Sequence, residues 1–158
     1  MTSFHLTPIG YVAIDSNETH ITSIRSVISP DTAASDDAPI LRSAIDWLDQ
    51  YFSGKRPSYL PPLAPEGTSF QKLIWSLLLR IPYGESVTYG SLAKKAAQLL
   101  GKETMSAQAV GGAVGRNPIL IMIPCHRVLG VDNKLTGFSA GIEKKIHLLQ
   151  TEGIDFRR

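Results

Sequence analysis

The sequence lacks the features that would mark a membrane, secreted or disordered protein. Its longest purely aliphatic run, residues 119–123, is far shorter than the ~20 apolar residues of a membrane span. The first residues have neither the basic start nor the apolar stretch of a signal peptide, so we expect a cytoplasmic protein that does not bind membranes. Hydrophobic residues make up 43% of the 158 residues and charged residues 19%, which excludes an intrinsically disordered chain.

Cysteine is nearly absent as well. The single Cys125 excludes an internal disulfide and any zinc site built from several cysteines. The N-terminal part offers only His5 and His20 as further metal ligands, and no Gly-Lys-Ser/Thr sequence marks a phosphate-binding loop. We therefore predict no metal and no cofactor. Cys125 itself is either a buried, inert thiol or a reactive one.

Charge is distributed unevenly along the chain. Residues 1–68 carry a net charge of −4, whereas residues 69–158 carry +6. A polyanionic partner would therefore meet the second part of the chain. The asymmetry is equally compatible with charges scattered over two solvated surfaces. The length suits one large domain or two small ones.

The N-terminal part is predicted to be rich in strands. Residues 10–14 and 19–24 are β-branched and partly alternating, and the polar residues 15–18 between them predict a hairpin turn. Residues 40–52 repeat apolar side chains at helical spacing. The proline-rich segment 57–67 is predicted to be an extended linker. The expected organisation is a strand-rich domain over 1–56, a linker over 57–67 and a second domain over 68–158.

The second domain is predicted to be mainly helical. Apolar residues at i, i+3, i+4 and i+7 predict a helix over 70–81, and Thr68 with Gln71 fits a capping box at its start. Two further helices, 88–100 and 106–114, predict a helix-turn-helix with an unusually long turn. Residues 128–138 suggest a hairpin or wing, and residues 141–150 a last helix. Strands followed by helices indicate an α+β fold.

The helix over 106–114 is unusual for one that binds DNA. Gln108 is its only side chain suited to reading base edges in the major groove. Gly111 and Gly112 each cost about 1 kcal/mol relative to alanine within a helix. Two interpretations remain open: the helix backbone approaches DNA closely in a shallow groove without reading sequence, or it packs tightly against a neighbouring helix.

Cys125 lies in the sequence Pro-Cys-His-Arg, directly after the apolar run. The thiolate is the nucleophilic form of cysteine, and a histidine oriented by a carboxylate would generate it. His126 and Glu152, which follows the last predicted helix, are candidates for that pair. A cysteine hydrolase would fit this set equally well.

Residues 67–153 resemble, almost end to end, the O6-alkylguanine-DNA alkyltransferases, also called methylated-DNA–protein-cysteine methyltransferases. Eight segments carry the resemblance, the most specific being the Pro-Cys-His-Arg sequence with its flanks: 67–71, 81–84, 88–93, 109–111, 117–118, 123–128, 137–139 and 145–153. The resemblance implies a small N-terminal domain of sheet and helix, similar to RNase H, and a C-terminal domain similar to a winged helix-turn-helix.

The resemblance also implies direct reversal of DNA damage in a single turnover. The alkyl group of O6-alkylguanine, and of O4-alkylthymine, would move irreversibly to Cys125 after the base flips out of the duplex. The implied catalytic residues are Cys125, His126, Glu152, Tyr89 and Asn117. The implied substrate-binding residues are Tyr89, Val128, Phe138, Ser139 and Lys145. The implied DNA-binding residues are Gln108, Ala107, Gly111, Gly112, Arg116 and Arg127.

The expected partner is double-stranded DNA, bound in the minor groove with little sequence specificity. The protein would act as a monomer, with cooperative binding along DNA as an alternative. The chain departs from the family where Gln108 replaces the usual arginine and where segment 94–105 is longer than expected. Three alternative functions remain open: a lesion-binding protein of the same fold, a cysteine hydrolase and a DNA-binding regulator. The presence of Cys125 speaks against the first, because the non-enzymatic relatives lack it.

Overall fold

The structure, a computed structural model, describes residues 1–158 apart from the side chain of Ala34. It divides into two compact units. The first comprises Met1–Glu66 and Pro118–Met122, and the second comprises Gly67–Asn117 and Ile123–Arg158. The segment expected to be a linker therefore belongs to the first unit as far as Glu66. Part of the apolar run that precedes Cys125 also returns to the first unit.

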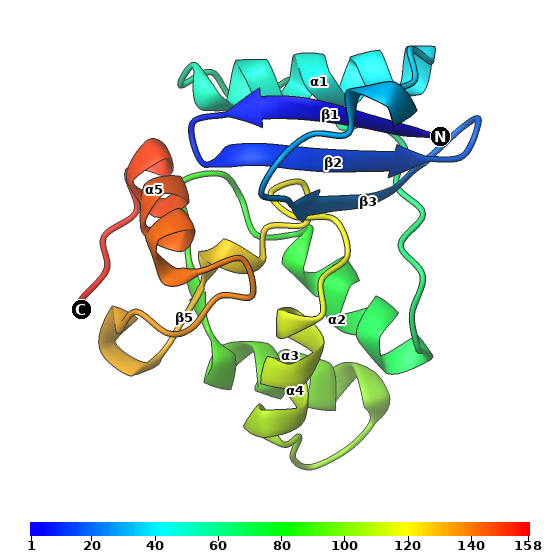
Figure 1. Ribbon diagram of the computed structural model, residues 1–158. Coiled ribbons are helices and arrows are strands. Elements are labelled where there is room, and N and C mark those ends of the chain that lie inside the picture. Colours follow the sequence, from blue (N-terminus) through cyan, green and yellow to red (C-terminus); the bar gives the residue numbers. More distant parts are fainter. The chain divides into compact units, whose positions relative to one another are not determined.

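The first unit is a three-stranded antiparallel sheet with a helix on one face (Figure 1). The strands lie in the order β1 (Thr2–Thr7), β2 (Gly10–Ser16) and β3 (Ile21–Ser26), with an irregular register at Asp15 and Ser16. Helix α1 (Pro39–Phe52) follows a short 3-10 turn, η1 (Thr32–Ala34). The core consists of aliphatic and aromatic side chains from the sheet and from α1, including Val12, Ile14, Ile21, Ile24, Leu41, Leu48 and Tyr51.

Strand β3 lies at an edge of the sheet, and segments without regular structure pair with it. Ile21 N donates to Pro62 O at 2.8 Å. Ile24 N donates to Pro118 O, and Leu120 N donates to Ile24 O, both at 3.0 Å. These bonds satisfy backbone groups that an open edge would leave exposed.

The buried aliphatic run 119–123 forms neither a helix nor a strand. Ile121 has a φ of 72°, a left-handed conformation that β-branched residues rarely adopt. Such a backbone persists where its surroundings fix it. Here Ile121 is 1% exposed, and Met122 N donates to Leu120 O across it at 2.8 Å. The run is held in a tight turn just before the segment that carries Cys125.

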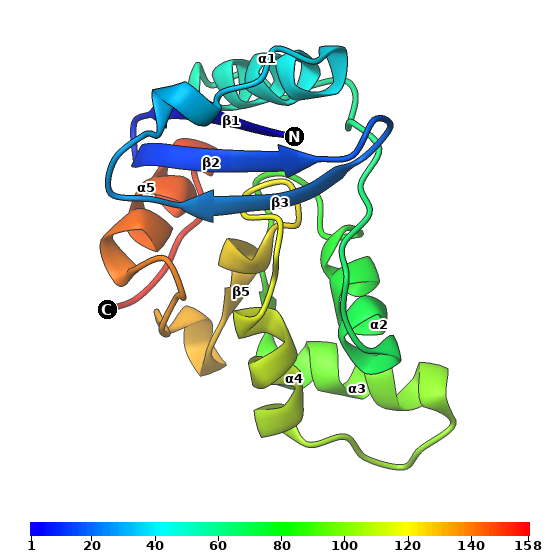
Figure 2. The ribbon, with the colours of Figure 1, turned by 45° about the vertical axis from the view of Figure 1, so that its right-hand side comes forward.

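The second unit contains four helices and two short strands that pair in parallel (Figure 2). The helices are α2 (Ser69–Leu78), α3 (Tyr89–Leu100), α4 (Ala107–Gly115) and α5 (Ile142–Glu152). The strands are β4 (Val87–Thr88) and β5 (Val128–Leu129). Two 3-10 turns are also present, η2 (Cys125–Arg127) and η3 (Val131–Asn133). The hairpin expected over 128–138 does not form, because β5 pairs with β4. Gly130 N instead donates to Lys134 O at 2.8 Å, which closes a turn.

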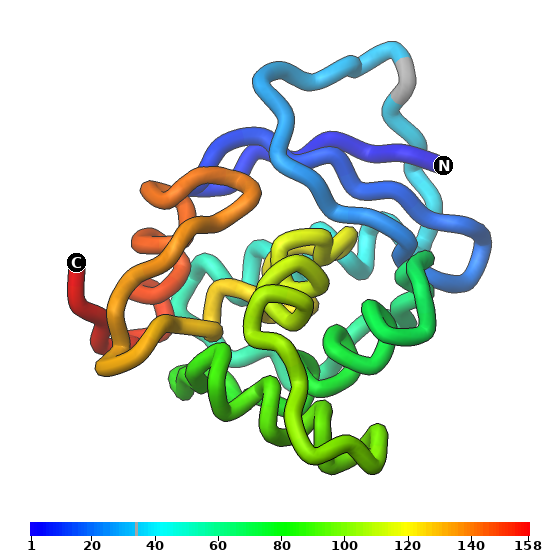
Figure 3. Tube along the Cα trace, turned by 90° about the horizontal axis from the view of Figure 1, so that it is seen from below, coloured from blue at the N-terminus to red at the C-terminus, as the bar shows by residue number. Residues whose placement is uncertain are grey.

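Side-chain caps set the starts of three helices in this unit, α2, α3 and α4. Thr68 and Gln71 form the predicted capping box of α2, and Thr88 and Ser91 form a second one at α3. Ser106 Oγ accepts from Ala109 N at the start of α4. Figure 3 shows the chain passing from α3 into α4 through residues 101–106. Helices α3 and α4 contact each other, as expected for a helix-turn-helix.

Helix α5 begins one residue later and ends two residues later than the sequence predicted. It includes Glu152 in its last turn and ends where Gly153 adopts the left-handed conformation, with a φ of 70°. A left-handed residue at this position favours glycine and satisfies the last carbonyls of the helix. The direction of the Glu152 side chain is therefore set by a helix and not by a loop. No helix among the described residues is long and apolar enough to cross a bilayer.

The capping box of α2 gives a first prediction. Thr68 Oγ1 accepts from Gln71 N at 3.1 Å, and Gln71 Oε1 accepts from Thr68 N at 3.0 Å. Thr68→Ala should lower the free energy of unfolding by about 1 kcal/mol. Thr68→Ser should stay close to the parent protein because it keeps the accepting oxygen. The measurement is the urea midpoint by circular dichroism, and an unchanged midpoint for Thr68→Ala would contradict the assigned cap.

Candidate active site around Cys125

Within the Pro-Cys-His-Arg sequence, Cys125–Arg127 form the short 3-10 turn η2, which Pro124 precedes. The three residues of the turn are buried. Cys125 N donates to Ile123 O at 2.8 Å, and Arg127 N donates to Pro124 O at 3.0 Å. The tight turn lets adjacent residues project in different directions. Cys125 lines a cavity, while His126 and Arg127 contact Glu152.

The Glu152 carboxylate lies within hydrogen-bond distance of three residues from two other parts of the second unit, the turn η2 and the loop around Gly84. His126 Nε2 lies 2.5 Å from Oε2, and Arg127 Nε donates to Oε1 at 2.7 Å. Gly84 N also donates to Oε1, at 3.0 Å. The Tyr83 hydroxyl donates to Thr151 O at 3.2 Å and fixes the same loop to the end of α5. The sequence suggested the His126–Glu152 pair, but not the loop that holds it.

Burial and charge determine which of these groups are ionised. Burial alone would raise the pKa of Glu152, but the hydrogen bonds and charges of His126 and Arg127 outweigh it and lower the pKa to about 2. Burial lowers the pKa of His126, against the opposing effect of Glu152. The pair therefore rests as a carboxylate beside a neutral imidazole. Since Nε2 donates to the carboxylate, Nδ1 is the nitrogen that can accept a proton.

The thiol is held in its protonated form. Burial raises the pKa of Cys125 to about 11, although a hydrogen bond with Asn117 and the charge of Lys145 oppose that shift. Asn117 Nδ2 also donates to Ile123 O at 2.7 Å, which fixes the amide beside the thiol. A reaction at Cys125 therefore has to remove the thiol proton as part of its mechanism.

Cys125 opens into a cavity of about 170 Å³. Its lining includes three residues that the resemblance implied for substrate binding, namely Tyr89, Phe138 and Ser139. Gly111, which was expected to bind DNA, also lines the cavity. The rest of the lining was not suggested by the sequence: Val114, Gly115 and Gly137. Cys125 is thus at the wall of a small pocket formed by η2, the start of α3, α4 and the segment before α5.

Lys145 and Val128 lie together behind this pocket and do not line it. Lys145 is fully buried, and its Nζ donates to Val128 O at 2.8 Å and to Thr136 Oγ1 at 3.1 Å. Burial lowers the pKa of Lys145 to about 8, although the neighbouring Cys125 opposes the shift. The Val128 carbonyl, expected to receive the guanine amino group, already accepts the Lys145 ammonium. The second lone pair of that oxygen is the one a ligand could use.

Arg127 lies differently from the expectation that it contacts DNA. Its side chain is 10% exposed. Besides its bond to Glu152, Nη1 donates to Ile81 O at 2.7 Å, and the guanidinium lies 5.7 Å from the centre of the Tyr83 ring. The guanidinium therefore makes its contacts within the protein. Arg127 is therefore a structural residue that balances the charge of Glu152.

The other residues expected to contact DNA lie on or beside α4. Ala107, Gln108, Gly112 and Arg116 are exposed, and Gly111 is half-buried. A Cβ atom added at Gly112 would meet nothing within 4 Å, and one added at Gly111 would come no closer than 3.9 Å to the Tyr89 ring. Tight packing against a neighbouring helix therefore does not explain these glycines. Helix α4 packs against α2 and α3 through buried side chains, and the indole Nε1 of Trp75 donates to Ala113 O at 2.9 Å.

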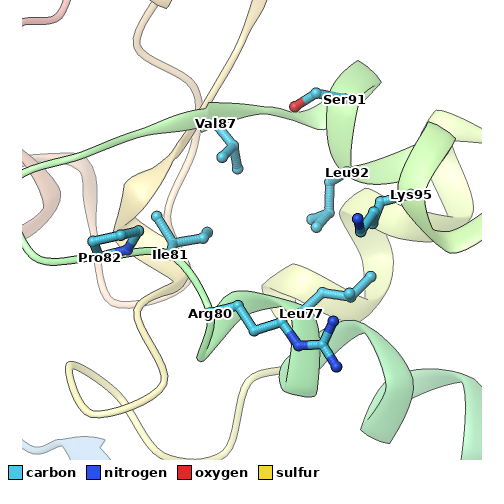
Figure 4. A pocket seen from close by; sticks show the side chains of 8 residues that line it. All are labelled: Leu77, Arg80, Ile81, Pro82, Val87, Ser91, Leu92 and Lys95. Atoms are coloured by element: carbon cyan, nitrogen blue, oxygen red, sulfur yellow. The ribbon is translucent and has the colours of Figure 1, made fainter.

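A second cavity, of about 260 Å³, lies between the end of α2 and the start of α3 (Figure 4). Its lining is mainly aliphatic with two cationic residues at its edge: Leu77, Arg80, Ile81, Pro82, Val87, Ser91, Leu92 and Lys95. It shares no lining residue with the Cys125 cavity. In the described part of the chain, no group of three or more His, Cys, Asp and Glu side chains could hold a metal ion.

Together, the fold and the site define a class: proteins with a helix-turn-helix unit in which a buried histidine–glutamate pair stands next to a cysteine that lines a pocket. Comparison with known families narrows the class. Residues 69–154 match the DNA-binding domain of 6-O-methylguanine DNA methyltransferase, and residues 2–65 match the ribonuclease-like domain of the same protein. The chain belongs to the 6-O-methylguanine DNA methyltransferase family.

Individual relatives agree with this assignment. The chain is 40% identical to the methylated-DNA–protein-cysteine methyltransferase of Haemophilus influenzae over 98% of this chain and 87% of that protein. It is 42% identical to the enzyme of the same name from Methanosarcina barkeri, over 95% of both chains. Among solved structures, Mycobacterium tuberculosis OGT in complex with DNA is 36% identical, with a TM-score of 0.83 over 96% of this chain and 91% of that one.

The buried carboxylate gives a prediction about stability and pH. Because the pKa of Glu152 falls from its usual 4.5 to about 2, its contribution is fully present above about pH 4.5 and is lost as the pH falls towards 2. Glu152→Gln should lower the free energy of unfolding by about 3 kcal/mol at neutral pH, the scale of a broken buried ion pair. The difference from the parent protein should vanish near pH 2.

Urea unfolding between pH 2 and 7 measures this difference. Glu143→Gln is the matched control, because Glu143 is an exposed glutamate in the first turn of the same helix. It should change the free energy of unfolding by no more than about 0.5 kcal/mol. A constant offset for Glu152→Gln at every pH would show that the carboxylate charge is not what stabilises the site.

Proposed function

We propose that the protein repairs DNA by moving the alkyl group of O6-alkylguanine, and of O4-alkylthymine, to the sulfur of Cys125. The main supporting observation is that the only cysteine lines a pocket beside a buried histidine–carboxylate pair. The relatives named methylated-DNA–protein-cysteine methyltransferases support the same chemistry.

The first step is removal of the thiol proton. Neutral His126 can accept that proton at Nδ1 through a water molecule, and the Glu152 carboxylate stabilises the imidazolium that forms. Arg127 and Gly84 keep the carboxylate in place through their bonds to Oε1. The Asn117 amide and the Lys145 ammonium favour the thiolate, since both lower the pKa of Cys125 against the effect of burial.

The second step is attack on the alkyl carbon. A bond forms between Cys125 Sγ and that carbon, the bond to guanine O6 breaks, and its electron pair moves onto the base. The Tyr89 hydroxyl can donate to a ring nitrogen and the Ser139 hydroxyl can donate towards O6, so both relieve the charge that develops on the base. Phe138 supplies a face of the pocket.

The product is a thioether, which has no good leaving group and is not displaced by water. Each protein molecule should therefore act once. This limit follows from the use of the protein's own cysteine as the acceptor, since the described part of the chain holds no other thiol to regenerate it.

DNA binding is proposed along α4, in the minor groove and with little sequence specificity. The exposed Gly112 and the open space around it let the helix backbone approach the groove. Arg116 adds a positive charge, and Gln108 can hydrogen-bond the base left unpaired. The target base must flip into the pocket, because its O6 atom cannot reach Cys125 from within the stack. We propose that the protein binds DNA as a monomer.

The proposed function predicts one alkyl group per protein. Incubated with a duplex that contains O6-methylguanine, the protein should gain the mass of one CH2 group on Cys125, and transfer should reach a plateau at a one-to-one ratio. Cys125→Ser should bind the same duplex but transfer nothing. Intact-mass spectrometry with peptide mapping measures both results. Repeated turnover, or transfer by Cys125→Ser, would refute the assignment.

Gln108 gives a prediction that separates flipping from chemistry. Gln108→Ala should slow repair of duplex DNA but leave the reaction with free O6-benzylguanine nearly unchanged, because the free base needs no flipping. Gln108→Arg should strengthen duplex binding by about 1 kcal/mol at low salt, since it adds one charge-assisted contact. Single-turnover kinetics and fluorescence anisotropy measure the two effects.

The matched control is Gln50→Ala, which removes a half-buried glutamine of α1 in the first unit whose Nε2 donates to Asp46 Oδ2 of the same helix. It should change neither repair nor binding. Equal rates on duplex DNA for Gln108→Ala and the parent protein would remove residue 108 from the mechanism. The longer segment 94–105, with Lys102 and Met105, would then be the next candidate for contacts with the unpaired base.

A further inference from the structure

Tyr89 lines the Cys125 pocket, and its hydroxyl is connected to the buried Lys145 ammonium through one other side chain. Lys145 Nζ donates to Thr136 Oγ1 at 3.1 Å, and Thr136 Oγ1 donates to Tyr89 Oη at 3.4 Å. We propose that Lys145, Thr136 and Tyr89 form a proton relay that delivers a proton to the guanine ring as the alkyl group leaves. This inference rests on the proposed function and concerns how the leaving base is neutralised.

The direction of the relay follows from the donors and acceptors in it. A lysine ammonium can only donate, so the Thr136 oxygen must accept from it. The single hydrogen of the Thr136 hydroxyl is then directed to Tyr89 Oη. Tyr89 accepts this bond and can turn its own hydrogen only towards another acceptor. The ammonium at one end therefore orients the hydroxyl at the other end to donate into the pocket.

Burial keeps this arrangement intact. Lys145 is fully buried, and a buried amine without partners would be costly, so its bonds to Val128 O and Thr136 Oγ1 hold it in one position. The pKa of Lys145 is lowered to about 8, which makes the ammonium readier to give up a proton than an exposed lysine. The 3.4 Å contact is long for an O–H···O bond, and catalytic hydrogen bonds commonly shorten when substrate binds.

The transfer balances as follows. The thiolate of Cys125 attacks the alkyl carbon, and the electron pair of the broken carbon–oxygen bond passes to guanine. Tyr89 gives its proton to ring atom N3, Thr136 gives its proton to Tyr89, and Lys145 gives one to Thr136. The products are a thioether, a neutral guanine and a neutral Lys145 amine. Both hydroxyl groups are unchanged, and no external acid is needed.

Thr136 is the residue on which the inference can be tested, because it acts only through Tyr89 and is a positioning residue. Thr136→Val removes the hydroxyl but keeps the shape of the side chain, and Thr136→Ser keeps the hydroxyl. With O6-benzylguanine, Thr136→Val should react about 10- to 100-fold more slowly than the parent protein, the effect of losing one charge-assisted hydrogen bond. Thr136→Ser should react at nearly the parent rate.

A second substrate separates the relay from a general disturbance of the pocket. In 3-deaza-O6-benzylguanine a C–H group replaces N3, so the relay has no acceptor. The parent protein and Thr136→Val should react with this analogue at equal rates. A variant whose pocket is merely distorted would be slowed with both substrates, and that result would overturn the relay.

A third measurement does not depend on the analogue. In a Tyr89→Phe background the relay has lost its last member, so adding Thr136→Val should cause no further loss with O6-benzylguanine. Additive losses would overturn the inference. A parent protein that transfers nothing from duplex DNA containing O6-methylguanine would refute the proposed function itself. An active parent with an equally active Thr136→Val would refute only the relay.

Discussion

The buried carboxylate of Glu152 is the constraint on which the geometry of the site depends. A charge in the interior needs partners, and this one takes them from the turn that carries Cys125 and from the loop around Gly84. The end of α5, the Cys125 turn and the segment between α2 and β4 must therefore meet at one place. Arg127 balances the charge, so that His126 can remain neutral without leaving a net anion in the core.

The site contains both a proton acceptor and a proton donor. Neutral His126, beside the anionic Glu152, can take up a proton. The Lys145 ammonium is buried and is connected to Tyr89 through Thr136. Alkyl transfer needs both, because a proton must leave the nucleophile while the leaving base gains negative charge. Keeping the two functions on separate residues lets the thiol stay protonated and inert until a substrate is present.

Sequence patterns predicted features that depend on neighbouring residues and missed those that depend on distant ones. Thr68 and Ser106 marked helix starts correctly, because a cap involves residues three positions apart. The pairing of β5 with β4 and the bond from Gly84 to Glu152 join residues about 40 and 68 positions apart, and no local pattern signals them. The partners of Arg127 were missed for the same reason: the resemblance implied a contact with DNA, whereas its guanidinium donates to Glu152, 25 positions away. Thr136 carries no motif of its own.

Residues Pro118–Met122 belong to the first unit although they lie within the sequence of the second. The two units therefore cannot be separated as independent segments of the chain. Residues 1–66 alone would lack the strand-like segment that pairs with Ile24, and β3 would then present an open edge of the kind that pairs with other chains. Residues 67–158 expressed without the first unit would keep this apolar segment but lose its backbone partners. No single cut in the sequence therefore separates the two domains. A chimaera that takes the first domain from a relative would also need the five residues Pro118–Met122 of that relative, because they pair with its sheet.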